Sequence, residues 1–486
     1  MKLKPNLLTL FVLVGLFGAS QTSAQQQAGY KLIDIGTFGG PVSYVLPAAQ
    51  IGSFSQLNAS GTLVGGAATS IPTTANSNPI VVCGGIEGDV PLVNHAIEWR
   101  NGSLLDLGGL AGTDHCSVAA SINASGVITG HSETAAIDPV TGWNEVHAVR
   151  WKNGTIMDLG TLGGTFSFGA GINKNGQIAG TALNAIPDPV SMYHFQILGL
   201  DSGTQTRAFL WTNGVMQDLG TLGGPDAWSN FVNDAGQVAG ASYTDSTINP
   251  TTGVPTTHAF LWDPVKGMID LGTLGGTLAG STLSNFEGGL NDLGQVVGAS
   301  YMPGDQVYHP FLWNSPGPMK DLGTLGGTNG VAYAINDAGE VIGNADLPGT
   351  VFDPFLHQGG FPISHAFLWK NGAMRDLGAL NGDKASAVGA INSKGQVVGY
   401  SCPWTCEDHR HDHAVLWQNG SIFDLNRLIR AGHTGLILTR AFAINDRGEI
   451  AGIGTPPGCS FDLVCSHAFI LVPCNEFAHG CGDARQ

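Results

Sequence analysis

A single sequence unit recurs along most of this chain, and it limits the possible folds more than any other feature. Its most regular part is an Asn followed by a turn and a short apolar stretch, as in Asn392-Ser-Lys-Gly395-Gln-Val-Val-Gly399. The Asn recurs at Asn58, Asn123, Asn173, Asn233, Asn291, Asn336, Asn392 and Asn445. Successive copies lie roughly 55 residues apart, close to the period of β-propeller blades.

Each copy contains four short segments typical of β-strands. One is aromatic and apolar, as in His258-Ala-Phe-Leu-Trp262, and the next ends in Asp-Leu. An Asn-Gly pair often separates these two, because both residues tolerate the positive φ of a type I′ hairpin turn. After a Gly-Gly turn, the third segment ends in the recurring Asn, and the fourth is of the Val-x-Gly type. This pattern predicts an all-β fold, a β-propeller of about eight four-stranded blades; seven blades or an open β-solenoid are the alternatives.

The two ends of the chain divide one copy of the unit between them. The first recognisable segment is Leu32-Ile-Asp34, which belongs to the middle of a copy, and the last is His467-Ala-Phe-Ile-Leu471, which begins one. A sheet that combines strands from both ends leaves no open edge, so this division favours a closed ring. We expect one propeller domain over residues 25–473 and a short Cys-containing tail over residues 474–486.

The first 24 residues have the features of a signal peptide. Lys2 and Lys4 precede the apolar stretch 7–17, and Thr22-Ser-Ala24 provides small residues for cleavage. The apolar stretch is shorter than the roughly 20 residues that a membrane-spanning helix needs. We therefore expect a secreted, extracellular or periplasmic protein with no membrane span.

Charge narrows the range of partners. The chain has a formal net charge of −17, and removal of the two lysines makes the mature protein more negative. Such a chain repels phosphate backbones, so nucleic acid is not an expected partner. Nucleophile elbows, phosphate-binding loops and His-Glu-x-x-His motifs are missing from the sequence, and no cofactor is expected.

The eight cysteines form four neighbouring pairs along the sequence, and disulfides are the default interpretation for an exported chain. The proposed pairs are Cys83 with Cys116, Cys402 with Cys406, Cys459 with Cys465, and Cys474 with Cys481. A zinc site formed by Cys402, Cys406, His409 and His411 is an alternative, although its spacing matches no standard zinc finger.

The repeat resembles the HAF family of predicted extracellular repeat proteins, named after its His-Ala-Phe triplet. The triplet occurs here at His258, His365 and His467, with looser forms at His95, His147, Arg207, His309 and His413. The resemblance covers nearly the whole mature chain. It implies export and a repeat architecture, and it carries no established activity.

The recurring polar residues are better explained by structure than by chemistry. The Asp of the second segment occurs eight times, whereas a catalytic group is normally needed once; its positions are Asp34, Asp106, Asp158, Asp218, Asp270, Asp321, Asp376 and Asp424. We expect these residues to hydrogen-bond turns or neighbouring strands within each blade. Calcium binding through the Asn turns is disfavoured because acids are too sparse there for six to eight oxygen ligands.

The insertions between copies indicate where a ligand would bind. Nearly all of them separate the Val-x-Gly segment from the next His-Ala-Phe segment, so in a ring they gather on one surface, here called the long-loop face. Its segments are residues 67–94, 132–146, 182–206, 242–257, 301–308, 345–364, 402–412 and 454–466. Its candidate ligand-binding aromatics are Trp143, Tyr193, Phe195, Tyr243, Tyr301, Tyr308 and Trp404.

Aromatic rings among polar residues suit sugars or protein surfaces. The leading hypothesis is therefore an exported, non-enzymatic binding or scaffold protein for an extracellular glycan, peptide or protein. The alternative is a secreted hydrolase or lyase acting on polysaccharide, with acids contributed by different blades.

Overall fold

The computed structural model describes residues 29–45, 55–78, 91–199, 203–279, 288–353, 358–406, 411–459, 462–474 and 481. The predicted signal peptide, residues 1–24, lies outside these ranges. Within them the chain is almost entirely β, and its helical turns are short: η1 (Met192–Ile197), η2 (Leu425–Leu428) and α2 (Asp462–Cys465). No helix in the described ranges has the length and apolar character needed to cross a bilayer.

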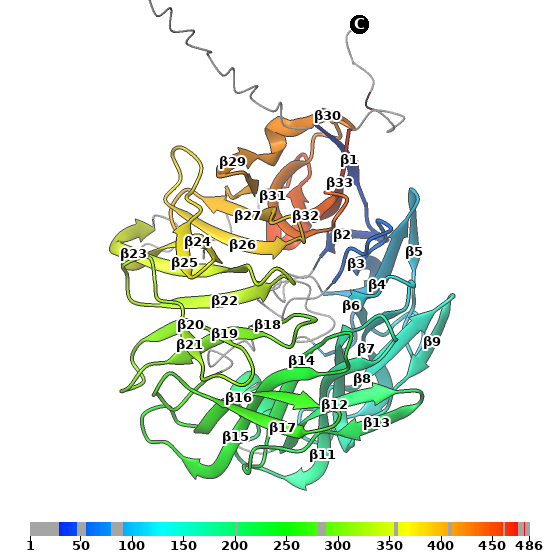
Figure 1. Cartoon of the computed structure of the whole chain (residues 1–486). Helices are drawn as coiled ribbons and strands as arrows, with labels where there is room; N and C mark the ends of the chain where they lie inside the picture. Colours follow the sequence, from blue (N-terminus) through cyan, green and yellow to red (C-terminus); the bar gives the residue numbers. More distant parts are fainter. Residues whose placement is uncertain are drawn as a thin grey trace, which may run out of the picture.

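Most strands belong to four-stranded units that follow one another in chain order, in a propeller-like arrangement (Figure 1). The first four units are β2–β5 (Gly39–Tyr44, Leu63–Pro72, Leu92–Arg100, Ser103–Asp106), β6–β9 (Ser117–Ile122, Ile128–Ile137, Asn144–Lys152, Thr155–Asp158), β10–β13 (Gly163–Ile172, Ile178–Pro187, Thr204–Thr212, Val215–Asp218) and β14–β17 (Ala227–Val232, Val238–Ile248, Pro255–Asp263, Gly267–Gly272). The next three are β18–β21 (Gly289–Leu290, Val296–Tyr301, Tyr308–Trp313, Lys320–Asp321), β22–β25 (Gly330–Ile335, Val341–Asp353, Gln358–Lys370, Ala373–Asp376) and β26–β29 (Ala385–Ile391, Val397–Cys402, His413–Gln418, Ser421–Asp424). One parallel pair, Phe166 with Val146, joins β6–β9 and β10–β13 into a single eight-stranded sheet.

The remaining sheet combines the two ends of the chain. Its strand order is β30-β1-β33-β32-β31, and the bounds are Ile429–Ala431, Tyr30–Asp34, His467–Pro473, Ile450–Thr455 and Ile437–Ile444 respectively. β1 pairs antiparallel with β33 from Tyr30 opposite Pro473 to Asp34 opposite Phe469. The first and last strands therefore lie side by side, as the divided copy predicts (Figure 1).

The recurring Asn residues connect neighbouring sheets. Each Asn follows the first strand of its sheet, is buried, and donates a side-chain N–H to the backbone carbonyl of the Asn in the next sheet, over 2.9–3.2 Å. The last of these bonds runs from Asn445 to Asn58, across 387 residues. The eight hydrogen bonds thus form a closed cycle. The sequence predicted only a turn at each Asn, and the bond from its side chain to the neighbouring sheet is an addition that the repeat pattern did not indicate.

The same Asn side chain also shapes its own turn. In Asn233, for example, Oδ1 accepts hydrogen bonds from the backbone N–H groups of Ala235 and Gln237, at 3.1 and 2.9 Å. An amide can do both tasks because it carries an acceptor and two donors. A carboxylate at this position would keep the turn and lose the bond between sheets.

Packing inside each sheet explains the glycine of the Val-x-Gly segment. The Phe of the His-Ala-Phe strand is fully buried at Phe209, Phe260 and Phe367. A Cβ built on the opposing glycine would lie 2.9 Å from the ring of Phe260 at Gly240, and within 2.8 Å of the corresponding ring at the other two sheets. The same Cβ would also lie only 1.9–2.0 Å from a backbone carbonyl oxygen of the first strand, so this carbonyl and the Phe ring together require glycine at the three positions.

The outer hairpins have the predicted turn. Asn101, Asn153, Asn213, Asn371 and Asn419 have φ angles of 51–52°, and the glycine after each also has a positive φ. Both central residues thus adopt the left-handed conformation that a type I′ turn requires. The Asn-Gly prediction is confirmed at all five positions.

The pairing of the two chain ends predicts that β1 contributes to global stability. Leu32 is 2% exposed and packs with Leu438 and Leu471 of the same sheet. We expect Leu32→Ala to lower the free energy of unfolding by about 2–4 kcal/mol, through lost burial and an unfilled cavity. Urea titration of the mature chain measures this, with Lys31→Ala as the control on the opposite side of the strand. Equal stabilities for the two variants would show that β1 unfolds independently of the rest.

Candidate functional site

The repeated His and Asp residues form pairs that hold the outermost strand of each sheet. His258 Nδ1 lies 2.8 Å from Asp270 Oδ1, and the same carboxylate accepts a hydrogen bond from the backbone N–H of Gly272. The equivalent pairs are His95–Asp106, His147–Asp158, His309–Asp321, His365–Asp376 and His467–Asp34. Arg207 replaces His and binds Asp218 at 3.0 Å. These bonds confirm that the recurring Asp fastens turns and strands within a sheet.

One copy departs from this pattern. His413 pairs with Asp383 at 3.1 Å instead of with the repeat Asp. That residue, Asp424, accepts from the backbone N–H of Asn426 and begins the short helix η2. Because the pairs recur around the molecule and can be exchanged, they do not mark a catalytic centre.

The pair at the chain ends has a defined electrostatic effect. Partial burial raises the pKa of Asp34, but hydrogen bonds from His467 and Gly36 and the charge of His467 outweigh it, and the pKa ends below its ordinary value. A carboxyl whose pKa is lower in the folded state stabilises the fold above its unfolded pKa, and this contribution disappears as the pH falls through the folded pKa.

We expect His467→Ala to move the acid unfolding transition to higher pH, because the pKa of Asp34 then rises. The loss of stability at neutral pH should be below about 1 kcal/mol, as for partly exposed ion pairs. His467→Arg should retain most of the wild-type behaviour, since Arg207 forms the same contact naturally. Urea midpoints measured from about pH 3 to pH 7 test this. An Ala variant with an unchanged pH profile contradicts it.

Three of the predicted disulfides are confirmed within the described residues: Cys402–Cys406, Cys459–Cys465 and Cys474–Cys481. Cys116 is also disulfide-bonded, and its predicted partner Cys83 lies outside the described ranges. The first bond uses both thiols of the alternative zinc site, so that site is not formed; His409 also lies outside the described ranges, and His411 packs edge-on against Trp404. The disulfides indicate an oxidising, extracellular or periplasmic environment.

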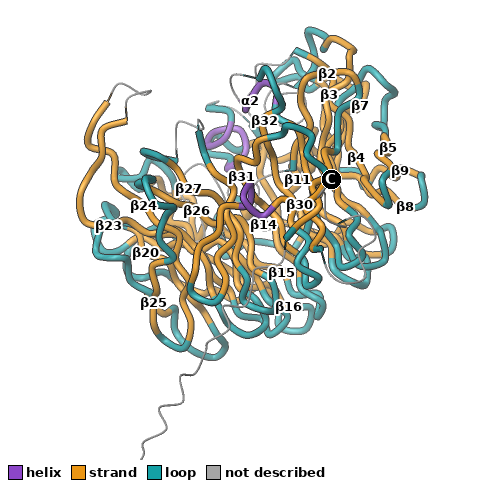
Figure 2. Tube along the Cα trace, turned by 90° about the horizontal axis from the view of Figure 1, so that it is seen from above, coloured by secondary structure: helices purple, strands orange, loops and turns teal. Residues whose placement is uncertain are grey.

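The strand directions place the long connections away from the Asn cycle. The second strand of each sheet starts at the Asn turn and runs to the opposite end, where it meets the connection to the third strand. Several connections are extensions of the sheet hairpins, and the β23–β24 hairpin stands out from the body of the molecule (Figure 2).

Two of the aromatic residues predicted to bind ligand are interior. Tyr193 is 1% exposed and packs against Phe166 and Phe168, while Tyr243 is 0% exposed and donates its hydroxyl to the carbonyl of Val190. Both rings pack beneath the insertion 182–206, and the prediction of surface contact is wrong for them. The side chain of Phe195 lies outside the described part of the structure.

The other four aromatics are partly exposed and stay candidates. Trp143 and Trp404 lie in separate loops, whereas Tyr301 and Tyr308 are cross-strand partners with ring centroids 5.4 Å apart.

An acid without a counterpart in the other copies anchors the insertion 182–206. Asp226 is fully buried, and its two oxygens accept from the backbone N–H groups of Met192 and Thr206, at 2.5 and 2.9 Å. Burial, and then the neighbouring carboxyl of Asp188, raise its pKa well above the ordinary value despite these donors. The carboxyl oxygens of Asp226 are bound to backbone groups inside the protein. Asp226 and its neighbour Asp188 therefore anchor the loop.

We expect Asp226→Ala to release the segment 188–206, because two backbone donors lose their acceptor. The cost should be about 2–4 kcal/mol locally. Limited proteolysis followed by mass spectrometry should show new cleavage within this segment. Asp245→Ala, at an exposed position on the neighbouring hairpin, is the control and should leave the pattern unchanged. Cleavage at unrelated sites in both variants would contradict a local anchor.

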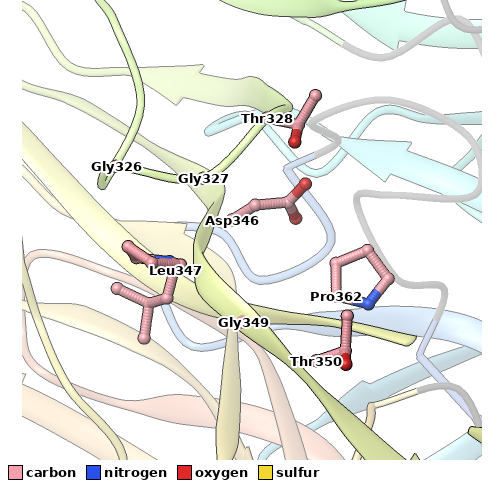
Figure 3. A pocket seen from close by; sticks show the side chains of 9 residues that line it. Gly326, Gly327, Thr328, Asp346, Leu347, Gly349, Thr350 and Pro362 are labelled. Atoms are coloured by element: carbon pink, nitrogen blue, oxygen red, sulfur yellow. The ribbon is translucent and has the colours of Figure 1, made fainter. Parts of the chain in front are cut away.

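A pocket of about 370 Å³ lies on the long-loop face, beside the β23–β24 hairpin. Its walls come from the Gly-Gly turn before β22, from residues 346–350 of β23, and from Pro362 of β24. The turn closes onto β23 through a hydrogen bond from Gly327 N–H to the carbonyl of Asp346, at 2.9 Å. Figure 3 shows the side chains of Thr328, Asp346, Thr350 and Pro362 gathered on one side of the strand.

Asp346 is the charged residue of this pocket. Its Oδ2 accepts from the backbone N–H of Asn329 at 3.0 Å, and Asn329 Oδ1 in turn accepts from the backbone N–H of Tyr308. Burial raises the pKa of Asp346, and the bonds from Asn329 only partly oppose this effect. The pocket therefore connects, through Asn329, to β20, which carries Tyr308 of the Tyr301–Tyr308 pair.

Residues 346–350 and Pro362 of this pocket fall in 345–364, one of the eight insertions of the long-loop face, but the sequence singled out neither this insertion nor any residue of the pocket. No other copy has an aspartate at the position of Asp346, and this residue belongs to no recognisable motif. It becomes part of a pocket only because the glycine turn of the same sheet folds onto it. The Pro residues and the length of this insertion were the available signals.

No model of a known protein family matches the chain, and no curated protein sequence matches it. Among solved structures, a puromycin hydrolase mutant complexed with PGG aligns with a TM-score of 0.35 and 12% identity, over 76% of this chain and 61% of that one. An acylaminoacyl peptidase from Pyrococcus horikoshii aligns with a TM-score of 0.35 and 8% identity, over 68% of this chain and 47% of that one. XC5397, a gluconolactonase from Xanthomonas campestris, aligns with a TM-score of 0.29 and 8% identity, over 74% of this chain and 90% of that one.

The chain thus spans about three fifths of the first of these proteins and about half of the second. At such TM-scores and identities, the alignments carry no functional inference.

Proposed function

We propose that this chain is an exported binding or scaffold protein of the HAF-repeat type, built as a closed eight-bladed β-propeller. The closed cycle of Asn hydrogen bonds and the pairing of β1 with β33 support the ring. The disulfides support folding in an oxidising compartment after export.

The long-loop face is the proposed ligand surface, and the pocket beside the β23–β24 hairpin is the observation that carries this proposal. Its volume of about 370 Å³ falls within the range of roughly 300–1,000 Å³ typical of ligand pockets. It also combines a partly buried carboxylate with hydroxyl groups and a Pro ring, as recognition sites do. The ligand class we propose is an extracellular glycan, peptide or protein.

The alternative, a polysaccharide hydrolase or lyase, needs two carboxyl groups that flank a substrate bond. The off-pattern pair Asp188 and Asp226 is the nearest match by residue type. Both carboxyls are buried and accept hydrogen bonds from backbone N–H groups of the loop they anchor. This observation favours binding over catalysis.

The mature chain, residues 25–486, should bind a subset of ligands on a combined glycan and peptide array. Shortening the pocket hairpin by joining residues 347 and 363 should abolish that binding, because one wall of the pocket is removed. The matched control shortens the β15–β16 hairpin by joining residues 245 and 253, on the same face.

Loss of binding in the first variant alone supports the proposal, provided that both variants give the far-UV circular dichroism of the wild type. Binding that survives in the first variant contradicts it. Turnover of a polysaccharide without stable binding would favour the enzyme.

A further inference from the structure

The charge of Asp346 has no partner inside its pocket. Among the described residues no Lys, Arg or His forms an ion pair with it, and none contributes to its pKa. By contrast, Glu340 of the same sheet pairs with Lys370, and its pKa falls below the ordinary value although partial burial acts against this. A partly desolvated carboxylate that lacks a cation gains most from a ligand that brings one.

The form of the pocket limits which cation fits. Asp346 Oδ2 already accepts from the backbone N–H of Asn329, so a guanidinium that donates two parallel hydrogen bonds to this carboxylate would have to share that oxygen with Asn329. A primary ammonium, a compact charge with three rotatable donors, needs only one oxygen and can also reach the hydroxyl of Thr328 or Thr350.

The rest of the lining suits an aliphatic chain better than a sugar. The described residues that line the pocket include no aromatic ring on which a sugar could stack. It has the ring of Pro362 and the aliphatic parts of two threonines, against which methylene groups can pack.

We propose that this pocket binds the ammonium group of a lysine side chain presented by an extracellular peptide or protein. The inference rests on the binding function proposed above and specifies its ligand. The negative net charge of the chain agrees with a basic partner, because it attracts such a partner over a distance.

The test is a titration of the mature chain, with its disulfides intact, with the peptide acetyl-Gly-Lys-Gly-amide, followed by isothermal calorimetry or NMR. Two matched peptides carry norleucine or Nε-acetyl-lysine in place of lysine. We expect binding of the lysine peptide and at least about tenfold weaker binding of the other two, since a charge-assisted hydrogen bond is lost. Binding should strengthen as the pH rises through the raised pKa of Asp346, because the ligand requires the carboxylate.

Asp346→Asn should weaken binding of the lysine peptide by a similar factor. Asp245→Asn, an equal charge change on the same face, should leave this affinity unchanged. Equal affinity for the lysine and norleucine peptides, or an unchanged Asp346→Asn variant, overturns the inference. So does binding of a chitosan oligomer in place of the lysine peptide. If the pocket hairpin is still needed for array binding while Asp346→Asn is neutral, the binding function stands and the lysine assignment fails.

Discussion

The hydrogen-bond cycle of the eight Asn residues is the constraint on which the arrangement of the sheets depends. Each four-stranded unit could in principle tilt or slide against its neighbour, since apolar packing alone is not directional. One side-chain N–H per sheet, bonded to a carbonyl of the next, fixes the height of every sheet relative to the following one. Because the amide also shapes its own turn, the position of a sheet and the conformation of its first hairpin are determined together.

The two faces of the molecule differ because only one of them carries the Asn hydrogen bonds. The Asn end consists of short, uniform turns in which a change at one sheet disturbs its neighbours. The opposite end carries connections of very different length, anchored individually by buried acids such as Glu133 and Asp226. Loops that are anchored locally can change in sequence without altering the Asn hydrogen bonds at the opposite end of the sheets. Variation in these loops is therefore compatible with a constant framework.

Much of the framework was predictable from the sequence, because it rests on patterns that recur. The Asn-Gly pairs predicted type I′ hairpins, the divided copy predicted the pairing of the chain ends, and the spacing of the cysteines predicted three confirmed disulfides. The site was less predictable because its distinctive side chains, such as Asp346, lie in insertions that differ from copy to copy. Tyr193 and Tyr243 have the same composition signal as exposed binding aromatics, and only the packing of the loops above Phe166 and Val190 determines that they are interior.

The pairing of β1 with β33 has a consequence for the biogenesis of this protein. β1 is synthesised before its partner β33. Asp34 can pair with His467 only after the 433 residues that separate them in sequence have been synthesised. Until then the growing chain has one unpaired strand at its start and one exposed sheet edge at its other end, both prone to association with other chains. A chain truncated before β33 would leave β1 without this partner and one edge of β32 uncovered.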